Sequence, residues 1–244
     1  MKQILLKDGE RLDDLHRNNY KIIQNPAYFA FGMDAVLLSS FAVVHKSETH
    51  MDLCCGNGVI PILLASKNKG ISYAGAEINE KLVDMAKRSV ALNGLEDKIT
   101  IYNTDIRYMD GFGTNFDVVT ANPPYMAAQT GAQNENYDMA IARHEILCNL
   151  EDVVSAAAKL LRYGGRFYMV HRPGRLADIV AALRKFDLEP KTLRLVQPKA
   201  DASPNTILIA AAKGGKPHLD IKPPLVVYND QGQYTEEIIR IYYD

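Results

Sequence analysis

The predicted fold is decided by Asp52-Leu53-Cys54-Cys55-Gly56-Asn57-Gly58, the sequence DLCCGNG. It ends a short apolar run at residues 50–54 and precedes a helical pattern at 59–67. A strand, a turn with two glycines and a helix bring backbone close to a bound ligand, because glycine has no Cβ. Pro61 replaces the third glycine of the dinucleotide fingerprint, which argues against a pyrophosphate at this helix.

Apolar runs alternate with helical patterns along the rest of the chain, which predicts an α/β fold with a mainly parallel sheet covered by helices. Helices are expected at 80–93, 153–161 and 177–185, and Gly164-Gly165 is expected to stop the second of these. Further strands are expected at 72–77, 99–103, 116–120, 166–171, 193–197 and 206–211, the last two as a pair.

Three regions are expected along the 244 residues. Residues 1–45 form an N-terminal extension with an apolar helix at 35–44, capped by Asp34. Residues 46–213 form the main domain, and 214–244 a tail with a hairpin and a short helix after Thr235. The long connection at 126–150 is expected to be a functional loop.

Composition excludes some classes of protein. The net charge is -1, and no window reaches the 18 or more apolar residues of a membrane span. The three cysteines form neither a disulfide framework nor a metal-ligand pattern, so we expect a reducing, cytoplasmic location and no metal.

Positive charge is concentrated late in the chain. Residues 143–222 carry 14 basic against 8 acidic side chains, whereas residues 1–142 carry 13 against 17. This excess indicates either a solvated face or a surface for phosphate contacts, with Arg172, Arg175 and Lys199 as candidates for the latter.

Polar side chains stand at the ends of four predicted strands. Glu77 ends the second strand, 19 residues after Gly58, and Asp105 follows the third. The carboxyl ends of parallel strands face one crevice, so Asp52, Glu77, Asp105 and Asn122 are expected to converge there. An acid at the position of Glu77 suits both ribose hydroxyls of an adenosine-bearing cofactor.

This order of features resembles the class I S-adenosylmethionine-dependent methyltransferases over residues 51–212. The resemblance implies a Rossmann-like fold, with a mainly parallel seven-stranded sheet whose last strand is antiparallel. It also implies S-adenosyl-L-methionine as cofactor. By position, Gly56 and Gly58 meet its methionine part, Glu77 its ribose and Asp105 its adenine; Asp52 and Asn122 complete this edge of the site.

The motif after the fourth strand is Asn122-Pro123-Pro124-Tyr125, which resembles the [ND]-P-P-[YF] motif of methyltransferases acting on amino or amide nitrogens. The lone pair of an exocyclic amine is delocalised into its ring and must be localised before attack. The Asn122 oxygen and the Pro123 carbonyl can accept hydrogen bonds from the two N–H groups of the amine. These contacts strengthen as positive charge develops on the nitrogen. Tyr125 offers a flat face for a planar base.

The segment from Phe29 to Leu38, with Gly32 and Asp34, resembles a stretch in bacterial tRNA1(Val) adenine-37 N6-methyltransferases that helps to close the cofactor site. The resemblance implies adenine N6 in RNA as acceptor, tRNA first. The segment from Gln197 to Asp201 supports the same family. Arg143 and His144, in the connection after the motif, are left outside the catalytic set.

Four alternatives stay open at this point. Glutamine methyltransferases of release factors share the motif, but 45 residues are too few for their N-terminal domain. Guanine-N2 rRNA methyltransferases use a similar motif, often with Phe as its last residue. A nicotinamide-binding oxidoreductase is disfavoured by Pro61. A module that binds S-adenosylmethionine without catalysis is disfavoured by the complete motif.

Overall fold

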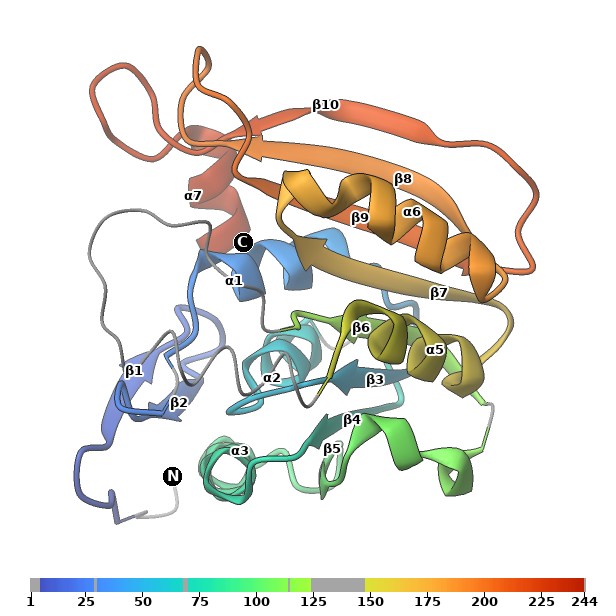
Figure 1. The fold of residues 1–244 in the computed structure, drawn as a ribbon. Coiled ribbons are helices and arrows are strands. Elements are labelled where there is room, and N and C mark those ends of the chain that lie inside the picture. The colour runs from blue at the N-terminus through green and yellow to red at the C-terminus, as the bar shows by residue number, and fades with distance from the viewer. Residues whose placement is uncertain (1–4, 29, 68–69, 114, 124–147, 244) are drawn as a thin grey trace.

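A computed structural model of the chain describes residues 5–28, 30–67, 70–113, 115–123 and 148–243. Its centre is an eight-stranded sheet in the order β10-β8-β9-β7-β6-β3-β4-β5 (Figure 1). Only β9 in this sheet runs antiparallel to its neighbours, β7 and β8. The strands are β3 (Thr49–Leu53), β4 (Ser72–Glu77), β5 (Ile99–Asn103), β6 (Phe116–Ala121), β7 (Leu161–His171), β8 (Leu188–Gln197), β9 (Thr206–Lys213) and β10 (Asp220–Val226).

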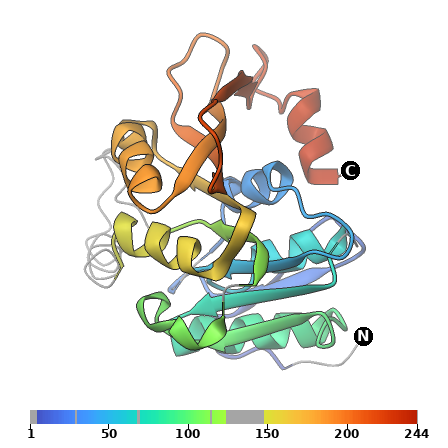
Figure 2. The same cartoon turned by 90° about the vertical axis from the view of Figure 1, so that its right-hand side faces the viewer.

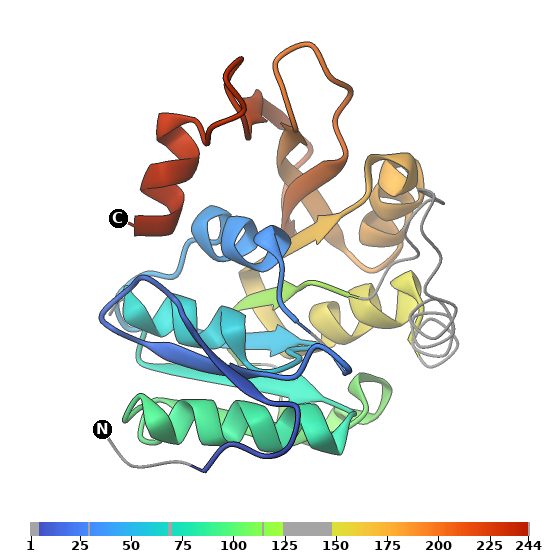
Figure 3. The same cartoon turned by 90° about the vertical axis from the view of Figure 1, so that its left-hand side faces the viewer.

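Helices cover both faces of the sheet (Figures 2 and 3). The core on one face includes α1 (Met33–Phe41), α2 (Val59–Ser66) and α3 (Glu80–Leu92), and the core on the other includes α5 (Leu150–Leu160) and α6 (Leu176–Lys185). The C-terminal α7 (Glu236–Tyr243) packs against α1. Among the described residues, the structure contains no helix with the length and apolar character needed to cross a bilayer.

Local sequence explains the helices beside the site. Every residue of α2 from Val59 to Ala65 is buried, because this helix lies under α1 and against the sheet. By contrast, α3 is amphipathic; Asn79 caps it through Lys81 N, and Gly94 follows it with φ +65°. The predicted boundaries of both helices agree with the structure to within one residue.

The N-terminal extension contains an antiparallel hairpin that we did not predict. Its strands are β1 (Arg11–Asp14) and β2 (Lys21–Gln24), and it lies across α2 and α3 (Figure 3). Backbone N–H groups of β2 donate to side chains of α3 and its C-cap: Lys21 N to Asn93 Oδ1 at 2.9 Å, and Ile23 N to Ser89 Oγ at 3.0 Å. The extension is therefore bound to the main domain by specific long-range contacts.

Three predictions of detail were wrong. Gly32, not Asp34, occupies the N-cap of α1, and the Asp34 side chain turns away toward β7. Gly164 and Gly165 do not end the helix: α5 ends at Leu160, and both glycines lie within β7, where the pairing with β6 is irregular. The tail adds β10 to the sheet, which has eight strands instead of seven, before the expected turn and α7.

Candidate active site at the carboxyl edge of the sheet

The turn after β3 has an unusual backbone. Cys54, Gly56 and Gly58 have φ values of +56°, +56° and +82°. A Cβ on Gly58 would lie 3.2 Å from the Cβ of Ala86 in α3, so glycine serves both the conformation and the close packing there. The predicted order of strand, glycine turn and helix is present, and Gly58 N donates to Cys55 O at 2.9 Å within the turn.

Glu77 is joined directly to this turn. Gly56 N donates to Glu77 Oε2 at 3.0 Å, and Asn79 N donates to Glu77 Oε1 at 2.9 Å. The residue is buried, although it ends a strand. Two backbone donors thus fix the carboxylate at the edge where β4 ends and α2 begins.

Asp52 lies below the turn in a buried polar chain. Thr120 Oγ1 donates to Asp52 Oδ1 at 2.5 Å and lies 2.8 Å from His50 Nε2. Burial, and after it the charge of Glu77, raise the pKa of Asp52 to about 8, against the lowering effect of Thr120; burial lowers the pKa of His50 to about 3. With Thr120 donating to Asp52, the neutral imidazole is the Nε2–H tautomer.

Sequence reasoning missed Thr120 and His50. The available signal was the two-residue spacing of His50 and Asp52, which places both on one face of β3. Thr120 pairs directly with Asp52 across β3 and β6. Asp52 Oδ2 and His50 Nδ1 are buried and have no hydrogen-bond partner among the described residues, so one polar atom of Asp52 is left for a ligand.

Asp105 follows β5, as expected, but it is already engaged. It caps a short 3₁₀ turn and receives hydrogen bonds from the backbone and guanidinium of Arg107. The Arg107 hydrogen bond lowers the pKa of Asp105. Ile78, next to Glu77, is an exposed apolar side chain that sequence reasoning also missed. An exposed isoleucine beside a buried acid signals an apolar wall at this edge.

Asn122 and Pro123 follow β6 directly. Leu53 of β3 pairs with Ala121, so Asn122 leaves the sheet beside the strand that leads into the glycine turn. Asn122 is half-buried and Pro123 is buried. Pro124, Tyr125, Arg143 and His144 lie outside the described residues. The four strand-end residues expected to converge thus come from four neighbouring strands at one edge.

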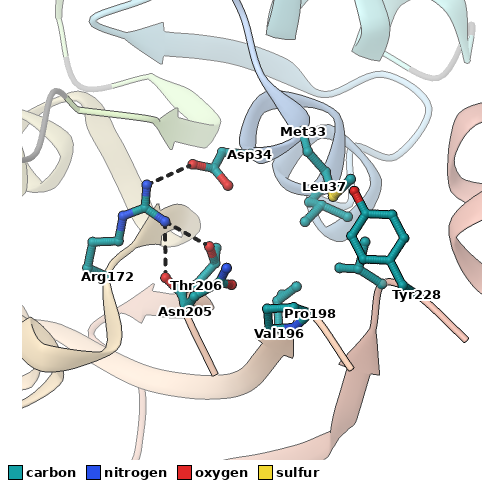
Figure 4. A pocket seen from close by; sticks show the side chains of 10 residues that line it. Met33, Asp34, Leu37, Arg172, Val196, Pro198, Asn205, Thr206 and Tyr228 are labelled. Carbon is teal, nitrogen blue, oxygen red and sulfur yellow. Dashed lines mark hydrogen bonds and ion pairs between the residues drawn. The ribbon is translucent and has the colours of Figure 1, made fainter. Parts of the chain in front are cut away.

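Gly32 and Asp34 lie at the start of α1, on the side of the edge nearer to β7. Asp34 Oδ2 is 4.0 Å from Arg172 Nη2, and Arg172 Nη1 donates to Asn205 O at 3.1 Å (Figure 4). Burial raises the pKa of Asp34, against the opposing effect of Arg172. Asp34 therefore shares a pocket with residues following β7 and preceding β9.

The basic excess after residue 143 is largely balanced by nearby acids. Arg172 faces Asp34, and Arg175 pairs with Asp178 at 2.8 Å. The same holds for other pairs: Arg162–Asp117, Arg166–Glu48, Arg184–Glu189 and Lys185–Glu151. This pattern favours a solvated, ion-paired face over a continuous surface for phosphates.

The described edge combines a glycine turn, a buried acid that is joined to it, and Asn122 and Pro123 after β6. The family model described as methyltransferase small domain matches residues 19–182. The chain belongs to the methyltransferase small domain family. Membership in this family excludes the nicotinamide-dependent oxidoreductase and makes the protein a methyltransferase.

Curated proteins that are similar in sequence match the chain over most of its length. The tRNA1(Val) (adenine(37)-N6)-methyltransferase of Bacteroides thetaiotaomicron is 28% identical over 217 residues, which are 87% of this chain and 89% of that protein. The enzyme of the same name from Parabacteroides distasonis is 26% identical over 213 residues, 86% of this chain and 87% of its own.

A solved structure confirms the methyltransferase fold. The predicted O-methyltransferase from Agrobacterium tumefaciens has a TM-score of 0.70 and 21% identity, with 86% of this chain and 95% of that chain covered. The class I methyltransferase fold predicted from the sequence is therefore confirmed, with β10 added to the edge.

Proposed function

We propose that this methyltransferase transfers a methyl group from S-adenosyl-L-methionine to N6 of an adenine in tRNA. The observation that carries the proposal is the position of Asn122 and Pro123, which follow β6 next to the strand that ends in the glycine turn. The names of relatives that match nearly the whole chain support the same acceptor.

The donor set of the edge fits S-adenosylmethionine. Asp52 Oδ2 is a buried polar atom without a hydrogen-bond partner among the described residues, and it lies near the carboxylate of Glu77. The negative charge of Glu77 suits a ligand with positive charge. Gly56 and Gly58 are proposed to approach its methionine part, Glu77 its ribose and Asp105 its adenine. When bound, the cofactor supplies an electrophilic methyl group on a sulfonium.

Ile78 and the N-terminal extension are proposed to enclose this site. Ile78 gives an apolar surface next to Glu77, suited to a flat ring. The Asn57 Nδ2 donates to Ile23 O at 3.1 Å, which ties residues 1–45 to the glycine turn itself. Phe31 N donates to Gln24 Oε1 at 2.8 Å and shapes the segment that leads to Gly32 and α1. These contacts support the role of the extension in closing the cofactor site.

The catalytic residues are proposed to act on the acceptor nitrogen. Asn122 Oδ1 and the Pro123 carbonyl accept hydrogen bonds from the two N–H groups of the adenine amine and so localise its lone pair for attack. Both acceptors gain strength as positive charge develops on nitrogen, which favours the transition state over the bound substrate. Asn122 also forms part of the cofactor side of the site. Tyr125 is proposed to stack on the adenine.

The test is methylation of purified tRNA and rRNA by the full-length protein, followed by mass spectrometry of nucleosides. N6-methyladenosine in tRNA is the expected product. Methylated guanine in rRNA would assign the protein to a guanine-N2 activity instead. Modification of a release-factor glutamine, with no RNA product, would move the acceptor from nucleic acid to protein.

Asn122→Ala tests the mechanism within the same assay. Loss of one preorganised polar contact is expected to lower turnover about 10²–10³-fold, with little change in affinity for S-adenosylhomocysteine. Asn115→Ala is the matched control, because Asn115 is exposed just before the opposite end of β6. Wild-type turnover in Asn122→Ala would contradict the amino-nitrogen mechanism.

A further inference from the structure

A cavity of about 210 Å³ (Figure 4) lies where β7 and β8 end, and in the strand order this is away from β4, which Glu77 ends. Its walls come from α1, from the ends of β7 and β8, from the start of β9 and from the residues after β10. β7 is the neighbour of β6, the strand that Asn122 follows. The cavity therefore lies beside the proposed acceptor position, one strand further along the sheet.

The polar groups of this cavity carry opposite charges. Arg172 donates to Asn205 O and to Thr206 Oγ1 at 3.2 Å, and its other terminal nitrogen faces Asp34. Because the guanidinium is opposed by a carboxylate, the cavity is poorly suited to an isolated phosphate. The donor groups of Arg172 instead lie beside the acceptor oxygens of Asp34. This pair suits the edge of a neutral ring that has both a hydrogen-bond donor and an acceptor.

The aromatic wall of the cavity is fixed before any ligand binds. Tyr228 stacks on Tyr234, with ring centroids 5.3 Å apart and an interplanar angle of 17°, and Tyr234 stacks on Tyr242 at 5.9 Å and 14°. Tyr228 N also donates to Pro198 O at 2.8 Å. Leu37 and Met33 line the same cavity as Tyr228 (Figure 4). A preset aromatic wall reduces the entropy lost when a planar ligand binds.

We infer that this cavity is a subsite for one unpaired nucleobase next to the methylated adenine, an inference that rests on the proposed action on RNA. Sequence-specific RNA recognition commonly holds splayed bases between aromatic or apolar surfaces and bonds their edges. The volume is below the roughly 300–1,000 Å³ of pockets that bury a whole drug-sized ligand, as expected for a single base. Tyr228 provides the stacking face, and Arg172 and Asp34 face the polar edge of the base.

The test removes the base and the tyrosine ring separately and together. An RNA stem-loop with the target adenine in its loop is made intact, or abasic at the 5′ or 3′ neighbour of that adenine. Wild type is expected to lose roughly 5- to 100-fold in kcat/KM with one of the abasic RNAs, mainly through KM. Tyr228→Ala should show that loss with intact RNA and no further loss with the abasic RNA.

Tyr163→Ala is the matched control, since Tyr163 is exposed near the other end of β7, and it should respond to the abasic RNA as wild type does. The abasic RNAs test the subsite with the wild-type protein alone, so the inference can be refuted even if Tyr228→Ala does not fold. Equal kcat/KM of the wild type for intact and abasic RNAs would overturn the subsite but not the proposed function. Additive losses when Tyr228→Ala is assayed with abasic RNA would have the same meaning. No methylation of any RNA would overturn the proposed function itself.

Discussion

The Gly56 amide and the Glu77 carboxylate meet at 3.0 Å across two neighbouring strands. One contact thus joins the backbone of the glycine turn to the acid that ends β4. The second oxygen of Glu77 accepts from Asn79 N. These two contacts fix the orientation of the carboxylate that is proposed to bind the ribose hydroxyls.

Glu77→Ala is expected to weaken binding of S-adenosylhomocysteine by about 1–3 kcal/mol, because ribose hydroxyls and the Gly56 amide lose their acceptor. Calorimetry measures this affinity, with thermal unfolding as a check on folding. Glu80→Ala, on the exposed first turn of α3, is the control and should bind as wild type. An unchanged affinity in Glu77→Ala would remove Glu77 from the site.

Tyr125 is expected to act through its ring. Tyr125→Phe should keep nearly full activity, since stacking needs the aromatic face and not the hydroxyl. Tyr125→Ala should raise KM for the RNA substrate, with a loss of roughly 1–3 kcal/mol in binding. Steady-state kinetics of the phenylalanine and alanine variants on one RNA substrate measure this difference. An inactive Tyr125→Phe beside an active Asn122→Ala would identify the hydroxyl as the working group.

Asp52 should make stability depend on pH. Its pKa is raised from 3.8 to about 8, chiefly by burial. The stabilisation is complete below about pH 4 and is lost as pH rises through about 8, because over that range the unfolded chain ionises while the folded chain keeps the proton. Denaturant unfolding from about pH 5 to pH 8 should show this loss, with a limiting slope of about 1.4 kcal/mol per pH unit.

Asp52→Asn is the comparison for that titration. It cannot ionise, so its unfolding free energy should decline less over the same range. His50 stays neutral in the folded protein, with a pKa of about 3, but titrates near 6.5 in the unfolded chain, so it raises stability with pH up to about 6.5. Both proteins share this contribution, so it cancels in the comparison. Parallel pH profiles for the two proteins would mean that Asp52 is ionised in the folded state.

Thr120 holds the buried chain together through one hydroxyl. Thr120→Val keeps the shape but leaves Asp52 Oδ1 and His50 Nε2 without Thr120 as partner, at an expected cost of about 1–3 kcal/mol in unfolding free energy. Thr120→Ser keeps the hydroxyl and should lose only about 1 kcal/mol for the missing methyl. Urea unfolding compares them, and a valine variant more stable than the serine variant would contradict the role.

Much of the central fold was predictable because its signals are local. The apolar run ending at Glu77 and the amphipathic repeat of α3 specify their own secondary structure. The hairpin β1–β2 was missed because β1 reads RLDD, with no alternating apolar face. Its turn instead uses positive φ at His16, Asn18 and Asn19, and the hairpin is held by side chains of α3 and its C-cap.

The parts of the site that depend on packing were harder to predict. Pro223 and Pro224 argue against a strand, yet β10 accommodates them as the edge of the sheet. Asp34 has the residue type and position of a helix cap, but its partner Arg172 is 138 positions away. Glu77 was predictable, because a strand-end acid after a glycine turn needs only local sequence to be recognised.

The anchoring of β2 also has a consequence for biosynthesis. Lys21 and Ile23 take their partners from Asn93 and Ser89, 72 and 66 residues later in the chain. At a synthesis rate of roughly 5–20 residues per second, the hairpin waits several seconds on the ribosome before these partners emerge. Its docking thus has to wait for the synthesis of α3, although its own residues are among the first to be made.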